Sequence, residues 1–345
     1  MEIEEKIDIV IPWVNDQDVQ WKQERSLYSN GFSDDKKDID KFYRDWNTLL
    51  YVFRGIEMFM PWVNKVHLLT YGHVPKWLNM DADKLNVVKH QDFYINPSHL
   101  PAFNSQSIEM NFLGIKGLSE KFIYFNDDTL VLKETPISRF YKDNLPLDFI
   151  IQNIPRQGFL YRLLISNDSY VDTMANNLRL INREFSKRKL LKQNPQLFYS
   201  SRYSFRSRLY NFFFNLLPHY YWFSNYHFQQ PYLKSNIEET YSIYKEEMDM
   251  TSSSRFRSKH DVNQYLYRYV RLAKGEFEPY EPNDTYCMVL SSYKAFLKNK
   301  HRINKVRFFC PNDSPHISEE DYIRTKRELT AILNDILPEK CSFEK

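Results

Sequence analysis

Hydrophobic strands alternate with helical segments over about the first 150 residues, and this order constrains the fold more than any other feature of the sequence. A helix is predicted from 46 to 59, where apolar residues recur at helical spacing until Pro61, and a second helix is predicted over 105–118. The expected strands are the short apolar runs at 7–14, 65–70, 85–89 and 121–125. Such alternation is typical of an α/β fold with a doubly wound, mainly parallel sheet of the Rossmann-like class.

Polar side chains follow two of these expected strands. Residues 15–18 come after the first strand, and Asn126, Asp127 and Asp128 come after the strand at 121–125. In open α/β sheets ligands bind beyond the carboxyl ends of the strands, so both clusters should lie on one rim. The carboxylates at 126–128 fit either a divalent cation bound to phosphate oxygens or a solvated turn. A strand expected at 305–309 leads into Asn312 and Asp313 and repeats the pattern.

Composition excludes some site classes. The chain of 345 residues has only 7 glycines, too few for a glycine-rich phosphate loop, so a metal, Arg or Lys side chains or a helix N-terminus must hold any phosphate. The net charge of +3 argues neither for nor against a nucleic-acid partner, and we expect a near-neutral protein that binds no nucleic acid. The three cysteines are scattered, which predicts neither a disulfide framework nor a zinc site and fits a reducing cytosol. No apolar run approaches the roughly 20 residues that span a bilayer.

We predict three regions: an α/β core at 1–150, a helical, aromatic-rich subdomain at 151–300, and a C-terminal strand and helix at 301–345 that complete the core. Basic residues are frequent from 183 to 208, and the aromatic stretch 209–223 follows. This pair is either a surface helix followed by a core segment, or an element that contacts anionic lipid at a membrane surface. Further helices are expected at 258–272 and from 319 to 336, before Pro338.

Several segments together resemble the Stealth family of capsular and exopolysaccharide phosphotransferases, which includes the catalytic part of the animal enzyme that puts GlcNAc-1-phosphate on lysosomal glycoproteins. The family has four conserved regions, and each has a counterpart here in the same order. The resemblance is carried by 7–18, by 44–128 with its long run SHLPAFNSQSIE at 98–109, by 227–232 with 257–262, and by FFCPND at 308–313.

The resemblance implies transfer of a hexose-1-phosphate from a UDP-sugar to a glycan hydroxyl, with a phosphodiester as product and UMP released. It implies Mg²⁺ or Mn²⁺ as cofactor and a lipid-linked or polysaccharide acceptor. The expected metal ligands are Asp127, Asp128, Asn312 and Asp313. The expected catalytic residues are His227 as base, Asp127, Asp128 and Arg257. The expected substrate-binding residues are Asn15, Asp18, Arg44, Arg54, Ser98, His99 and Asn104.

Two other functions fit parts of the pattern. A metal-dependent glycosyltransferase would use the same acidic strand end and release UDP instead of UMP. A carbohydrate- or membrane-binding protein would use the many aromatic side chains without catalysis. The N-terminal residues have no basic region followed by a long apolar run, so we expect a cytoplasmic protein, peripheral on the inner face of the plasma membrane if 183–223 binds lipid.

Overall fold

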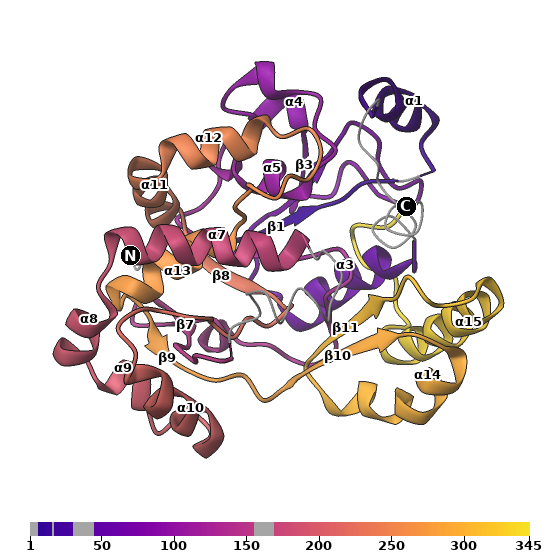
Figure 1. Cartoon of the computed structure of the whole chain (residues 1–345). Coiled ribbons are helices and arrows are strands. Elements are labelled where there is room, and N and C mark those ends of the chain that lie inside the picture. The colour runs from indigo at the N-terminus through magenta and orange to yellow at the C-terminus, as the bar shows by residue number, and fades with distance from the viewer. Residues whose placement is uncertain (1–5, 16, 30–44, 155–168) are drawn as a thin grey trace, which may run out of the picture.

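The computed structural model describes residues 6–15, 17–29, 45–154 and 169–345. A five-stranded sheet in the order β3-β2-β1-β4-β8 forms the centre of this part of the chain (Figure 1). The four strands from β3 to β4 are parallel, and β8 pairs with β4 in the antiparallel direction. The strands of this sheet are β1 (Ile7–Pro12), β2 (Val66–Thr70), β3 (Leu85–Lys89), β4 (Lys121–Tyr124) and β8 (Gln230–Leu233). The prediction of a mainly parallel α/β sheet is therefore confirmed.

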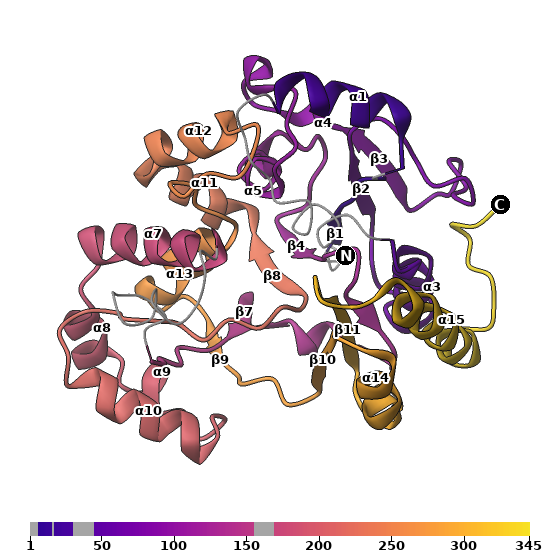
Figure 2. The ribbon, with the colours of Figure 1, turned by 45° about the vertical axis from the view of Figure 1, so that its right-hand side comes forward.

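Both faces of this sheet are buried, because successive side chains of a strand point to opposite faces. Ile9 and Ile11 of β1 join one hydrophobic core, and Val10 between them joins another. The first core contains residues of α3 (Thr48–Phe59), α14 (Tyr293–Asn299) and α15 (Glu319–Ile336). The second contains residues of α7 (Ser169–Glu184), α11 (Lys234–Ile243) and α13 (Tyr265–Lys274). In Figures 1 and 2 these two sets of helices lie on opposite sides of β1.

Two smaller sheets complete the strand pairing of the described residues. One has the order β10-β11-β5 and consists of β10 (Thr285–Leu290), β11 (Phe308–Asp313) and β5 (Leu130–Val131). The other has the order β6-β7-β9 and consists of β6 (Tyr141–Lys142), β7 (Leu145–Asp148) and β9 (Glu278–Pro279). Helix α14 packs against β10 and α15, as Figure 2 shows.

The remaining helices are short. They are α1 (Val19–Tyr28), α4 (His90–Phe93), α5 (Ser105–Glu109), α8 (Lys187–Gln193), α9 (Gln196–Tyr199), α10 (Phe205–Asn215), α12 (Lys245–Ser253), and the 3-10 turns η1 (Pro97–His99), η2 (Phe112–Gly114), η3 (Ile137–Arg139) and η4 (Lys300–Lys305). No helix in the described ranges is both long and apolar enough to cross a membrane. The predicted division into three regions stays a prediction.

Three boundaries differ from the prediction by more than two residues. The helix expected over 105–118 ends after Glu109, and a tight turn follows in which a side chain on Gly114 would collide with the carbonyl oxygen of Phe93. The helix expected from 258 begins only at Tyr265. The expected strand at 305–309 instead runs from Phe308 to Asp313, because its later residues pair with β10. The predictions for α3 and α15 are confirmed.

Candidate active site

The acidic residues after β4 lie at the carboxyl rim of the main sheet. Val10 of β1 pairs with Tyr124 of β4, and the backbone amide of Phe125 donates to the carbonyl oxygen of Val10 at 2.9 Å. The chains of both strands therefore leave the sheet at the same end, with 126–128 following β4 and Asn15 following β1. The expectation that both polar clusters share one rim is confirmed.

His227 reaches this rim because of how β8 pairs. Gln230, the first residue of β8, lies opposite Tyr124, the last residue of β4, in an antiparallel ladder. The residues before β8 therefore continue past the end of β4, and the His227 Nε2 atom lies 3.6 Å from Oδ1 of Asp128. Desolvation of the half-exposed ring favours a lower pKa for His227, but Asp128, together with Cys287 and Asp127, raises the pKa above its ordinary value.

Strand β11 adds a thiol to the same place. Its residue Phe309 pairs with Leu130 of β5, directly after the acidic turn. Consequently the next residue, Cys310, lies beside Asp128, and its Sγ donates to Asp128 Oδ2 at 3.4 Å. One ligand atom each from Asp128, His227 and Cys310 lies within 4.8 Å of the other two. The sequence prediction named the segment that contains Cys310 but did not name Cys310 as a site residue.

Carboxylates concentrate negative charge around Asp127 and Asp128. Burial raises the pKa of Asp127 well above its ordinary value, and the charges of Asp128 and Asp45 raise it further. In addition, Oδ1 of Asp128 is buried and has no hydrogen-bond partner within the described residues. A divalent cation would relieve this charge and occupy that oxygen, so these residues fit a metal. Asp45 is a second residue of this site that was not predicted, although it lies inside a segment on which the family resemblance rests.

A buried carboxyl group connects to the site through side chains. Glu109 Oε1 lies 3.0 Å from the hydroxyl of Tyr124, which also lies 2.9 Å from Oδ1 of Asn126. The Asn126 amide nitrogen lies 3.3 Å from Nε2 of His227. The Tyr124 hydroxyl has one hydrogen and can donate to only one of these two groups. When Glu109 is protonated, its carboxyl group donates to the Tyr124 oxygen, and the Tyr124 hydroxyl donates to Asn126. Burial raises the pKa of Glu109 to about 7, which favours that protonated form.

Arg257 lies near this chain of hydrogen bonds. Its guanidinium group is exposed and donates to the hydroxyl of Ser105 at 3.2 Å, at the start of α5. The charges of Arg257 and His227 both lower the pKa of Glu109, against the larger effect of burial. The structure therefore brings Arg257 into the electrostatic surroundings of the site.

The residues expected to hold the nucleotide have local partners. The Asn15 backbone amide donates to Nε2 of His73 at 2.7 Å, and its side chain accepts from the amide of Gln17. Asp18 caps α1 by accepting from the amide of Trp21 at 2.8 Å, and it lies 3.8 Å from Nδ1 of His73. Both residues lie on the predicted rim, and their ligand role stays a prediction.

Two predicted contacts do not fit the structure. The guanidinium of Arg54 forms two hydrogen bonds with the carboxylate of Glu344 and one with the carbonyl oxygen of Leu337, so it holds the C-terminal segment instead of a phosphate. Asn104 is only 1% exposed. Its Oδ1 caps α5 and its Nδ2 donates to Asp261 at 2.9 Å, which leaves no polar atom for a sugar.

Other predicted residues lie in turns. The Ser98 hydroxyl donates to Asn96, and Nδ1 of His99 lies 2.8 Å from the hydroxyl of Ser252. Ser98 is exposed and remains able to contact a ligand, whereas both ring nitrogens of His99 have protein partners. Arg44 lies outside the described residues.

The predicted metal ligands of β11 divide between its two faces. Side chains alternate along a strand, so Asn312 shares a face with Cys310 while Asp313 lies on the other face. Asn312 lies next to Cys287, whose pKa Cys310 and Asn312 both lower, and Asp313 accepts from the amide of Ser314 at 2.8 Å. The described residues thus gather Asp128 with His227 and Cys310, and Asp313 does not join them.

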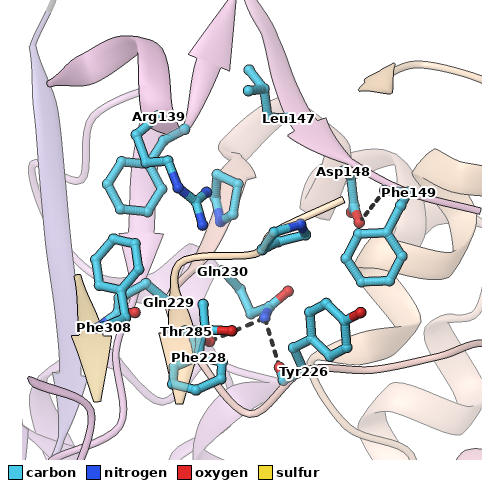
Figure 3. A pocket seen from close by; sticks show the side chains of 13 residues that line it. Arg139, Leu147, Asp148, Phe149, Tyr226, Phe228, Gln229, Gln230, Thr285 and Phe308 are labelled. Carbon is cyan, nitrogen blue, oxygen red and sulfur yellow. Dashed lines mark hydrogen bonds between the residues drawn. The ribbon is translucent and has the colours of Figure 1, made fainter. Parts of the chain in front are cut away.

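A small pocket lies beside the segment that carries His227. Figure 3 shows its lining, which includes Tyr226, Gln230 and, from the neighbouring strands, Asp148 and Phe308. The side-chain amide of Gln230 donates to the carbonyl oxygens of Tyr226 at 3.1 Å and of Phe228 at 3.0 Å. These two bonds lie on either side of His227 and hold its backbone in place. Asp127 and Asp128 do not line this pocket.

Comparison with known proteins agrees with this geometry. A family described as "Stealth protein CR2, conserved region 2" matches residues 42–147. The chain is 36% identical to "Capsular polysaccharide phosphotransferase WcwK" of Streptococcus pneumoniae over 99% of this chain and 98% of that protein. It is 32% identical to "Exopolysaccharide phosphotransferase cps2G" of Lactiplantibacillus plantarum, over 98% of this chain and 96% of the other. It is 31% identical to "Receptor polysaccharide phosphotransferase WefC" of Streptococcus gordonii, over 99% of both. A chain this similar over nearly its whole length, with acidic residues and a histidine gathered at one rim of an α/β sheet, belongs to the Stealth family of polysaccharide phosphotransferases and is a transferase.

Proposed function

We propose that this enzyme transfers a hexose-1-phosphate, for example GlcNAc-1-phosphate, from a UDP-sugar to a hydroxyl of a glycan acceptor. The acceptor oxygen attacks the phosphorus next to the sugar. The bond between that phosphorus and the bridging oxygen breaks, and UMP leaves with the bridging oxygen. A phosphodiester forms, and the hydroxyl proton passes to a base on the enzyme. The observation that carries the proposal is the cluster of Asp128 and His227 at the carboxyl rim of β4.

His227 is the proposed base. It is about half exposed, so a substrate hydroxyl can reach its ring, and Asp128 lies within 3.6 Å. When the ring takes up a proton, the Asp128 carboxylate stabilises the imidazolium by its charge, while Asn126 contacts the ring from the side of β4. Arg257 is proposed to contact phosphate, since a guanidinium group can bind two phosphate oxygens at once.

Asp127 and Asp128 are proposed to hold Mg²⁺ or Mn²⁺ together with the diphosphate of the donor. The buried Asp128 oxygen without a described partner supports this assignment, as does the raised pKa of Asp127 beside two other carboxylates. A bound divalent ion would offset the negative charge that develops on the phosphoryl oxygens. Asn312 is kept as a neighbouring ligand candidate, and Asn15, Asp18 and Ser98 are kept as contacts for the nucleotide or sugar.

The decisive experiment identifies the nucleotide product. The purified protein is incubated with a panel of UDP-sugars, Mg²⁺ or Mn²⁺ and a glycan acceptor, and the released nucleotide is identified by mass spectrometry. UMP together with a phosphodiester-linked product supports the proposal. UDP with no phosphate in the product would instead identify a glycosyltransferase, for which the same acidic strand end would serve. Asp128→Asn should remove turnover while circular dichroism shows an unchanged fold.

We also propose that the enzyme contacts an anionic membrane surface through α10, which would suit a lipid-linked acceptor. The apolar side of helix α10 is exposed to solvent. Its residues Ser207 and Asn211 are buried, and Asn211 donates to two backbone carbonyls. The exposed hydrophobic side chains of this segment are Phe205, Leu209, Phe212, Phe213, Leu216 and Leu217.

The spacing of these side chains supports the membrane contact. Phe205, Leu209, Phe212 and Leu216 follow one another at intervals of three and four residues, which places them on one side of a helix. Phe205 is 73% exposed and Leu216 is 69% exposed. Arg206 lies within the same segment, is exposed, and carries a positive charge that attracts anionic lipids. The later part of the aromatic stretch differs, since residues 220, 222 and 223 belong to a hydrophobic core. Such a contact would place the enzyme on the cytoplasmic face of the membrane.

A further inference from the structure

The side chains next to Asp128 include nitrogen and sulfur ligands, which are softer than the oxygen ligands that Mg²⁺ prefers. Mg²⁺ prefers oxygen ligands and retains several waters. Asp128 offers oxygen, but His227 offers nitrogen and Cys310 offers sulfur, with one ligand atom of each within 4.8 Å of the others. Carboxylate, imidazole and thiolate together are a ligand set for Zn²⁺ and similar transition ions.

Three separate segments hold this set in place. Asp128 lies between β4 and β5, His227 precedes β8, and Cys310 lies within β11. The sulfur of Cys310 lies 3.4 Å from Asp128 Oδ2, and the His227 ring lies 3.6 Å from Asp128 Oδ1. Because β4 and β5 pair directly with β8 and β11, the three ligands are positioned by strands before any ion arrives.

Two further observations point to a ligand at this position. Oδ1 of Asp128 is buried and lacks a hydrogen-bond partner within the described residues. A second thiol, Cys287 of β10, lies opposite Cys310 in the strand register. Four-coordinate zinc sites with three protein ligands keep a fourth position, which a water, a phosphate oxygen or this second thiol could fill.

We propose that Asp128, His227 and Cys310 form a binding site for a zinc-class transition ion, and that this ion competes with the catalytic use of His227. A ring nitrogen bound to a metal has no free electron pair to accept the proton of the acceptor hydroxyl. The zinc-bound form is therefore inactive. The competition rests on the proposed function of His227, whereas the existence of the site does not.

The site is tested first by binding, without any substrate. The metal-free, reduced protein is titrated with Co²⁺ as a spectroscopic probe and with Zn²⁺ by calorimetry. We expect one strong site, a thiolate-to-cobalt absorption band in the near ultraviolet, and displacement of Co²⁺ by Zn²⁺. Cys310→Ser should strongly reduce the absorption band and weaken Zn²⁺ binding by at least about tenfold, on the scale of losing one ligand.

A control variant and a second ligand variant show whether the effect is specific to the proposed ligands. Cys341→Ala removes a buried cysteine from the C-terminal segment and should leave the band and the affinity unchanged. Asp128→Asn gives a second ligand variant in case Cys310→Ser does not fold, which circular dichroism reports. Equal Zn²⁺ affinity in the wild type and in the folded ligand variants, or Co²⁺ binding without a thiolate band, overturns the site.

The competition is tested separately by activity. Zn²⁺ should inhibit UMP release at the concentration at which it saturates the binding site, and a chelator followed by Mg²⁺ should restore it. If Zn²⁺ binds at Cys310 while UMP release continues unchanged, the competition is wrong. If the protein binds Zn²⁺ but releases no UMP with any donor, the proposed function fails and the zinc site stands.

Discussion

Replacement of Glu109 by glutamine should change how the stability of this protein depends on pH. Glu109 is buried between Tyr124 and the backbone amide of Gln264, and burial raises its pKa from 4.5 to about 7. Between these two pH values the folded chain keeps the proton that the unfolded chain releases. Unfolding therefore releases a proton, and stability falls as the pH rises through this window.

The size of the effect follows from the difference between the two pKa values. At 1.36 kcal/mol for each pH unit, a change from 4.5 to about 7 corresponds to roughly 3 kcal/mol between the two ends of the window. Glutamine has nearly the shape of the protonated acid: its amide can donate to Tyr124 while its oxygen accepts from Gln264. Glu109→Gln should therefore lack this pH dependence and should be the more stable protein above neutral pH.

The assay is urea unfolding followed by tryptophan fluorescence, at several pH values from about 5 to about 8, for both proteins. We expect the difference in unfolding free energy between variant and wild type to change by roughly 3 kcal/mol over this range. Glu238→Gln, which alters an exposed carboxylate on α11, serves as the control and should shift stability by less than about 0.5 kcal/mol. Unfolding curves of Glu109→Gln and wild type that keep a constant separation at every pH would refute the assignment of a protonated Glu109.

Three other changes test separate parts of the structure. His227→Ala should lower kcat by on the order of 10²–10⁴ with Zn²⁺ removed, and a loss of less than about tenfold would assign the base to another residue. Phe212→Ser should weaken co-sedimentation with anionic lipid vesicles, while Leu27→Ser, at a more exposed position on α1, should not; equal binding by both would exclude α10 as the contact. Arg54→Ala leaves the partly buried Glu344 carboxylate of the C-terminal segment without its ion pair and should destabilise the protein by about 1–3 kcal/mol, measured by urea unfolding, with normal turnover of the folded fraction. A loss of kcat in folded Arg54→Ala would instead support the predicted role of Arg54 in substrate binding.

Local sequence patterns predicted the elements whose boundaries depend on neighbouring residues. The apolar run at 85–89 and the periodic helix ending near Pro61 appear in the structure as β3 and α3. The pattern failed where distant contacts decide the outcome. A helix over 105–118 satisfied local propensity, but the close approach of Gly114 to the backbone of Phe93 requires a turn there. Likewise β11 extends through Cys310 to Asp313 because β10 supplies a pairing partner that its own sequence does not reveal.

The sequence by itself placed polar side chains at the carboxyl ends of two strands, because strand direction and an abrupt change from apolar to acidic residues are local properties. It also supplied His227 and the segment around Cys310 through the family resemblance. Only the tertiary structure brought these together, since the pairing of β8 with β4 and of β11 with β5 joins segments about 100 and 180 residues apart. Thiol, imidazole and carboxylate come together as the proposed metal-binding group through those pairings, and no spacing along the chain encodes their proximity. For the same reason Arg54 and Asn104 could not be assigned from sequence, because their partners Glu344 and Asp261 lie 290 and 157 residues away.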